Sequence, residues 1–183
     1  MTPTPQAGVT PPVRVAGFAS GGGTNLQALL DHETADGPYH IVVVISDREG
    51  AGALGRAEAA GRLARVIEVK GRPSEEVATE TLALLESLEV QAIFLSGYLR
   101  MIPAAVVSAY RRRILNIHPA LLPAFGGKGM FGPHVHEAVL STGAEVSGAT
   151  VHYADEEYDT GTIVGQWSVP VLLGDDARSL AAR

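Results

Sequence analysis

Short apolar runs alternate with amphipathic stretches along most of the chain. The run 41–46 (IVVVIS) is apolar almost throughout, which is typical of a strand covered on both faces. Strands are predicted at 13–19, 41–46, 65–69, 91–96, 113–117, 147–154 and 162–171. Apolar positions at helical spacing predict helices at 24–32, 51–61, 74–89, 103–110 and 134–141, with Ser74 as the capping residue of the third.

This alternation predicts the fold class. Strands that alternate with helices indicate a doubly wound, mainly parallel α/β sheet, and the last two strands are expected to be antiparallel at one edge. No repeat or second-domain linker interrupts the pattern. Residues 1–12 are polar and proline-rich, so we expect a flexible leader followed by a single domain over 13–183. Ligands of such sheets bind beyond the carboxyl ends of the strands.

Composition narrows the function classes. The 183 residues include 14 Lys and Arg against 20 Asp and Glu, a net charge of −6. This acidic balance argues against broad nucleic-acid binding, and Arg111, Arg112 and Arg113 are expected to be solvated surface. The absence of cysteine excludes disulfides and thiolate metal sites. With no secretory signal and no apolar run of membrane-spanning length, we expect a soluble, cytoplasmic protein.

Three consecutive glycines connect the first predicted strand to the first helix. They allow backbone N–H groups of Gly23, Thr24 and Asn25 to approach an anion at the helix N-terminus, which predicts a phosphate site. The dinucleotide motif fails because Leu26 replaces its last glycine, and the P-loop lysine is missing. The alternative is that Ser20 or Thr24 only caps the helix.

Asn116 and His118 interrupt the fifth apolar run, two residues apart. Because alternate residues of a strand share a side, both side chains are expected to project together near the strand's carboxyl end. An amide that stabilises an oxyanion beside an imidazole that moves a proton suits acyl transfer. A core histidine that bonds a backbone carbonyl is the alternative, and spacing alone leaves both open.

A histidine acting in proton transfer usually has an orienting carboxylate. The segment 154–162 offers Asp155, Glu156, Glu157 and Asp159, which could equally form a solvated loop. Asp159 stands where this loop turns into the next strand, but the spacing does not select it from the other three.

The remaining histidines carry weaker signals. His134 and His136 form an H-x-H pair, but no further ligand cluster accompanies them, so a loop and helix position is favoured over a metal site. His152 alternates with apolar neighbours and is expected to be packed or to support another residue. His32 and His40 are expected at the surface. No metal is expected.

Four segments together resemble the phosphoribosylglycinamide formyltransferase family, and the similarity runs in order from about Val13 to Arg183. They are SGGGTNLQALL, LSGYLRMIP, ILNIHPALLPAF and SGATVHYADEEYDTGTIVGQ. The resemblance implies a Rossmann-like formyltransferase fold. It also implies transfer of a formyl group from 10-formyltetrahydrofolate, as co-substrate, to the amine of glycinamide ribonucleotide in purine biosynthesis.

The resemblance also implies roles for particular residues. Asn116, His118 and Asp159 match the catalytic residues, with Asp159 raising the pKa of His118 so that it stays protonated. The loop Gly23, Thr24 and Asn25 matches the loop that holds the nucleotide's phosphate. The residues that match the folate pocket are Leu99, Arg100, Met101, Ile102 and Asn116.

Three departures from the family pattern stand out. A folate-contacting arginine of the family aligns with Ser74, with Arg72 two residues earlier. The loop 125–133 is longer than in some relatives, and the resemblance leaves the direction of Lys128 open. A helix predicted to begin near Asp175 is cut by Arg183, so a C-terminal helical tail is expected to be missing.

Three other functions are the alternatives to this one. A methionyl-tRNA formyltransferase needs a further domain and a basic surface, and a formyltetrahydrofolate hydrolase carries an extra amino-terminal domain. A non-catalytic folate- or nucleotide-binding domain is the third alternative. Either a monomer or a homodimer is compatible with the sequence.

Overall fold

A computed structural model describes residues 11–183, so all but two residues of the predicted leader lie outside the described part. One seven-stranded sheet has the order β3-β2-β1-β4-β5-β6-β7. Its strands are β1 (Val13–Phe18), β2 (Tyr39–Ser46), β3 (Leu63–Val66), β4 (Ala92–Leu95), β5 (Ile114–His118), β6 (Val146–Tyr153) and β7 (Ile163–Pro170). β1 to β5 are parallel, and β6 and β7 are antiparallel, as predicted.

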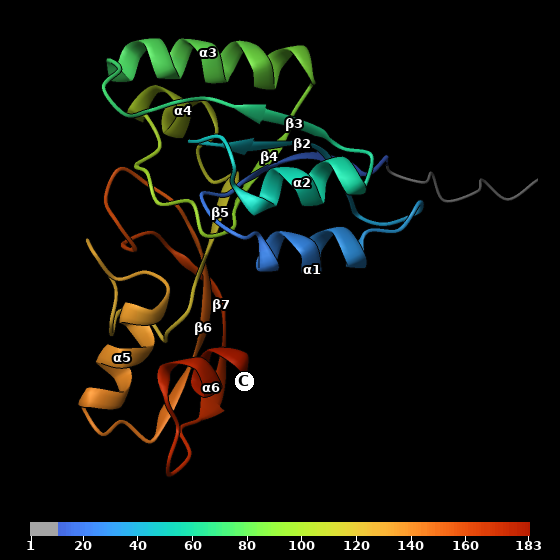
Figure 1. Cartoon of the computed structure of the whole chain (residues 1–183). Helices are drawn as coiled ribbons and strands as arrows, with labels where there is room; N and C mark the ends of the chain where they lie inside the picture. Colours follow the sequence, from blue (N-terminus) through green and yellow to red (C-terminus); the bar gives the residue numbers. More distant parts are fainter. Residues whose placement is uncertain (1–10) are drawn as a thin grey trace, which may run out of the picture.

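Helices cover both faces of the sheet (Figure 1). They are α1 (Thr24–His32), α2 (Gly52–Ala59), α3 (Ser74–Ser87), α4 (Ala104–Ala109), α5 (Pro133–Ser141) and α6 (Ala177–Ala182). Helices α3 and α4 lie on one face of the parallel strands and α1 and α2 on the other, while α5 and α6 pack together beside β6 and β7. Within residues 11–183, no helix is long and apolar enough to cross a membrane.

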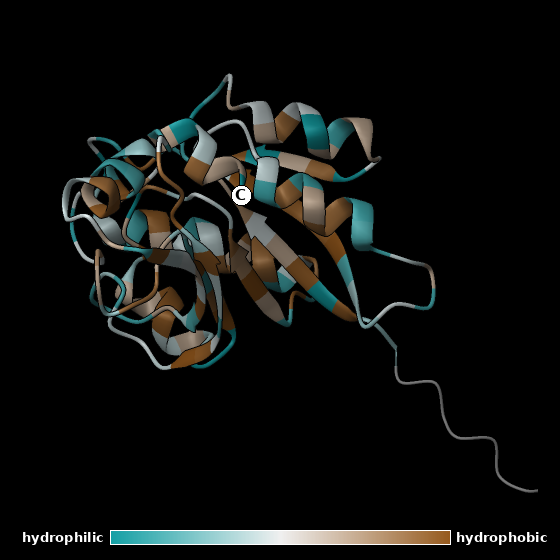
Figure 2. Ribbon diagram, turned by 90° about the horizontal axis from the view of Figure 1, so that it is seen from below, coloured by the Kyte–Doolittle hydropathy of each residue, from teal (hydrophilic) through white to brown (hydrophobic). Residues whose placement is uncertain are grey.

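The two faces of the sheet form separate apolar clusters. Val43 and Ile45 point to the cluster under α3 and α4, whereas Val44 points to the cluster under α1 and α2. Hydrophobic residues accordingly line the central strands in Figure 2, and the helices show mixed colouring. This two-sided burial explains why β2 has no polar alternation.

Two local predictions differ from the structure. The third strand was expected at 65–69, but β3 spans Leu63–Val66, because the ladder with β2 pairs Leu63 with Val43 and ends at Val66 opposite Ser46. Ser74 was expected to cap the third long helix. It is instead the first helical residue, after an extended Pro73, and makes no capping hydrogen bond.

Two glycine-to-alanine changes are expected to have opposite effects on stability. A Cβ at Gly161 would overlap the Tyr153 carbonyl oxygen, whereas a Cβ at Gly55, inside α2, meets nothing within 4 Å. We expect Gly161→Ala to lower the free energy of unfolding by about 2–4 kcal/mol. Gly55→Ala should raise it by about 0.5–1 kcal/mol, because alanine restricts the unfolded chain. Denaturant titration measures both, and an unchanged Gly161→Ala variant would show that the 154–162 loop is not packed this tightly.

Candidate active site

The two polar residues predicted from the sequence, Asn116 and His118, lie at the end of β5. β5 ends at His118, and its antiparallel neighbour β6 pairs Asn116 with His152 and His118 with Thr150. Paired residues of adjacent strands share a side of the sheet, so these four side chains form one polar group on an otherwise apolar pair of strands. Pro119 follows at once and cannot donate to the ladder.

Both ring nitrogens of His118 face acceptors. Its Nε2–H donates to the Phe125 carbonyl oxygen at 2.8 Å, and Nδ1 lies 3.5 Å from Asp159 Oδ2. The His118 side chain is 3% exposed. A proton arriving at Nδ1 would therefore lie between the ring and a carboxylate.

Two opposing effects act on the pKa of His118. Burial lowers the pKa of His118 below its ordinary value, and the Asp159 carboxylate and the Phe125 carbonyl raise it without fully offsetting burial. The effect of Asp159 has the expected direction, but the net pKa is lowered. Asp159 therefore acts on the His118 pKa in the direction that the resemblance implies, and burial opposes it.

Asp159 lies between two histidines. Its Oδ2 accepts the Gly127 N–H at 2.8 Å and faces His118, while Oδ1 lies 3.5 Å from His152 Nε2. Burial alone would raise the pKa of Asp159, but His152, the Gly127 N–H and His118 together lower it, so the carboxylate is ionised. Asp159 adopts a left-handed backbone (φ 59°), which turns its side chain into the cluster. Among the four acids considered from the sequence, Asp155 instead bonds within its own loop.

His152 orients Asn116. The Tyr153 carbonyl accepts from His152 Nδ1 at 3.0 Å, which fixes the proton on that nitrogen. Nε2 then accepts from Asn116 Nδ2, also at 3.0 Å. One hydrogen of the Asn116 amide is held by this contact and its second hydrogen stays available.

The glycine loop forms the mouth of α1. Gly23 is the N-cap residue in a left-handed conformation (φ 71°), Thr24 begins the helix, and no side chain caps it. Ser20 and Thr24 are therefore not helix caps. A Cβ at Gly23 would come within 2.8 Å of Ala53, so a larger residue would push α2 away. The exposed Thr24 and Asn25 lie at an N-terminus that carries partial positive charge.

The segment 99–102 follows β4, beside the glycine loop. Leu99 and Met101 are partly exposed, whereas Ile102 is buried in the core under α4. Arg100 donates its Nε–H to Asp47 Oδ2 at 2.8 Å. The sequence therefore predicted residues that the fold brings to the carboxyl ends of β1, β4 and β5.

A cleft of about 390 Å³ lies between α4 and the 154–162 loop. Its lining includes Val107, Arg111, Arg112 and Tyr153. The arginines were expected to be plain surface. Arg112, although exposed, stacks over the Tyr153 ring at 5.5 Å and has a left-handed backbone (φ 56°).

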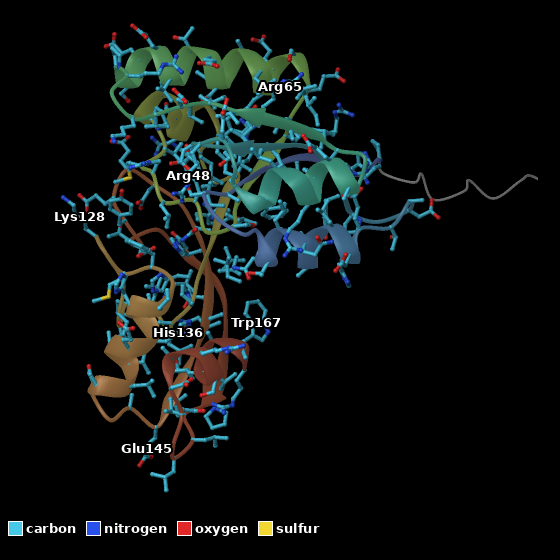
Figure 3. All side chains as sticks on the ribbon, viewed as in Figure 1. Arg48, Arg65, Lys128, His136, Glu145 and Trp167 are labelled. Atoms are coloured by element: carbon cyan, nitrogen blue, oxygen red, sulfur yellow. The ribbon has the colours of Figure 1, made fainter. Side chains whose placement is uncertain are left out.

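Other residues considered from the sequence lie outside the cluster. His134 and His136 are both on α5, and Lys128 lies at the outer margin of its loop (Figure 3). Across residues 11–183, no three acidic or histidine side chains gather as a metal-binding set.

Three further residues named from the sequence lie at the surface or in ion pairs. Arg72 donates to Glu80 at 2.7 Å, which ties it to α3. His32 is exposed as expected, but His40 pairs with the buried Glu33 at 2.6 Å.

Sequence reasoning missed several contributors to this site. The Phe125 carbonyl gives no signal because it belongs to the backbone. The contact between His152 and Asn116 depends on the register of β5 and β6. Asp47, directly after a predicted strand, was a detectable signal, because acids at strand ends face the ligand side of such sheets.

Comparison with known proteins identifies relatives over most of the chain. A family model described as "Formyl transferase" matches residues 13–183. A chloroplastic phosphoribosylglycinamide formyltransferase of Arabidopsis thaliana is 42% identical over 93% of this chain and 59% of its own length. A phosphoribosylglycinamide formyltransferase of Mycobacterium tuberculosis is 38% identical over 94% of this chain and 78% of its own length.

A solved structure of a protein with the same name as these relatives is also similar to this chain. The phosphoribosylglycinamide formyltransferase of Brucella melitensis has a TM-score of 0.85 and 42% identity, and the match covers 93% of this chain and 86% of that protein. The chain spans less than two thirds of the plant relatives, 59% of the Arabidopsis protein and 55% of the Vigna unguiculata protein. The match to the family model over residues 13–183 and these identities show that the chain belongs to the formyl transferase family.

Proposed function

We propose that this protein transfers a formyl group from 10-formyltetrahydrofolate to the amine of glycinamide ribonucleotide, which gives N-formylglycinamide ribonucleotide and tetrahydrofolate. The observation that carries the proposal is the cluster at the end of β5, in which Asn116, His118 and Asp159 are joined directly or through His152. An oriented amide beside a buried imidazole and carboxylate is what formyl transfer to an amine requires.

Each substrate has a candidate position. Gly23, Thr24 and Asn25 would hold the nucleotide's phosphate, because the α1 N-terminus offers N–H groups that no side chain caps. Leu99, Arg100, Met101, Ile102 and Asn116 would contact the folate.

The chemistry follows from the hydrogen bonds. The substrate amine attacks the formyl carbon, and the formyl oxygen becomes an oxyanion that accepts the free hydrogen of the Asn116 amide. After its own proton has moved to Nδ1, beside Asp159, His118 takes onto Nε2 the proton that the attacking amine nitrogen loses, and Asp159 stabilises the imidazolium that forms. The tetrahedral intermediate then breaks its bond to the folate nitrogen, which receives a proton from His118.

The Phe125 carbonyl accepts a hydrogen bond from His118 Nε2, whereas Asp159 faces the other ring nitrogen, Nδ1. Nε2 can act on substrate only after this hydrogen bond is released. We therefore expect substrate binding to displace the Phe125 carbonyl, with Asp159 holding the ring through Nδ1 meanwhile.

The remaining parts of the proposal concern the setting. We propose 10-formyltetrahydrofolate as the co-substrate, no metal, a monomer or homodimer, and action in the cytoplasm on small molecules without nucleic acid or membrane. The negative net charge of −6 supports binding of small molecules over binding of nucleic acid.

The proposal is tested by measuring loss of 10-formyltetrahydrofolate with and without glycinamide ribonucleotide. We expect consumption that depends on the nucleotide and saturates with both substrates. Equal consumption without the nucleotide would indicate a hydrolase instead. Binding of either substrate with no consumption would indicate a non-catalytic binding domain.

A further inference from the structure

We propose that Ser20 and Asp47 are positioning residues, which hold the segment 99–100 against the glycine loop and so set the relative places of the two substrates. The inference rests on the proposed function. Neither side chain is expected to touch the reacting atoms. They act by joining the loops that follow β1, β2 and β4.

Ser20 joins the loops after β1 and β4. Its N–H donates to the Gly97 carbonyl at 3.1 Å, and its Oγ accepts the Leu99 N–H at 2.9 Å. Its carbonyl accepts from Arg48 Nε at 2.7 Å, and Arg48 lies at the carboxyl ends of the parallel strands in Figure 3. Ser20 is almost completely buried and immediately precedes the three glycines. A shift of the 97–99 backbone would therefore change its position relative to the glycine loop.

Asp47 extends this connection to Arg100. Its side chain is 1% exposed and pairs with the Arg100 guanidinium, which is 43% exposed. Burial raises the pKa of Asp47, but the Ser20 hydroxyl and the charges of Arg100 and Arg48 lower it further than burial raises it. The carboxylate is thus ionised at neutral pH and fixes residue 100 directly after the Leu99 contact.

The location of this network indicates that it positions substrates and does not only stabilise the fold. β1 and β4 are adjacent strands whose connections leave in opposite directions, and ligands of doubly wound sheets bind at this point. The other end of β2 carries a comparable ion pair that lies away from the site. There Glu33, whose side chain is 5% exposed, binds Arg62 at 2.6 Å and accepts the Ile41 N–H.

These two ion pairs give a matched experiment, Asp47→Asn against Glu33→Gln. Each change removes the charge of a buried carboxylate with little change of shape. For Asp47→Asn we expect KM for 10-formyltetrahydrofolate and Kd for tetrahydrofolate to rise roughly tenfold, because a displaced contact segment loses factors of this order or more. KM for glycinamide ribonucleotide should stay within about twofold. Glu33→Gln should lower Tm and leave both KM values unchanged.

An Asp47→Asn enzyme with unchanged folate KM, or with both KM values raised equally, would overturn the inference. If Asp47→Asn does not fold, Arg100→Gln removes the same ion pair from its exposed side and should raise folate KM similarly. Where both single variants fold, the double variant should be no worse than the worse single variant, and additive losses would contradict a shared action. A wild-type protein that transfers no formyl group, yet binds tetrahydrofolate more tightly than Asp47→Asn, would refute the proposed function and keep the inference.

Discussion

Replacing His118 with alanine is expected to lower kcat by roughly 10²–10⁴-fold, the usual contribution of a positioned proton-transfer group. Among Asn116, His118 and Asp159, only an imidazole ordinarily gains and loses a proton near neutral pH, so neither of the other two can replace His118 as a proton carrier. Tetrahydrofolate affinity should stay within about threefold of wild type, because the proposed folate contacts come from segment 99–102 and Asn116. Steady-state kinetics and calorimetric titration measure the two quantities.

His118 is buried, so the measurement needs a control for folding. His118→Asn retains more of the side-chain volume and should show the same loss of kcat with a smaller loss of Tm. A decrease of only a few-fold in either variant, with normal folate binding, would mean that His118 does not carry the proton.

Replacing Asp159 with asparagine is expected to lower kcat by about 10²-fold and to move the acidic limb of the pH–rate profile to lower pH. The carboxylate favours the imidazolium form and raises the pKa of His118 against the effect of burial. Without that charge the pKa falls further, so His118 stays neutral to a lower pH. Asparagine also tolerates the left-handed backbone at this position, which separates the loss of charge from backbone strain.

Asp155→Asn is the matched control for this prediction. Asp155 lies four residues earlier, and its carboxylate accepts from Glu157 and Thr160 within the loop. Removal of the Asp155 charge should leave the acidic limb of the pH–rate profile at the same pH. If Asp159→Asn also leaves the limb unchanged, the Asp159 charge does not act on His118.

Much of the fold could be predicted because local patterns determine it. The continuous apolar run of β2 reflects burial by helices on both faces, and α1 spans the predicted residues 24–32. β3 was misplaced because its apolar residues continue through Val69, whereas its extent depends on pairing with β2. Ladder pairing involves residues about twenty positions away and is not visible in a local pattern.

The site was predictable only in part, for the same reason. Asn116 and His118 share a side of one strand, so their spacing was informative. The acid that faces His118 is chosen by a left-handed turn at Asp159, which the sequence of four nearby acids did not reveal. Arg100 and Asp47 are 53 residues apart in the chain, so their pairing required the fold.

The central claim, that the formyl group passes to an amine of the nucleotide, is tested most directly by the destination of a labelled formyl carbon. The wild-type protein would be mixed with 10-[¹³C]formyltetrahydrofolate and glycinamide ribonucleotide and followed by carbon NMR. The proposed function predicts that the label appears in the new amide of the nucleotide, in equal amount to the tetrahydrofolate formed. Label that appears as formate, or that remains on the folate, would contradict it.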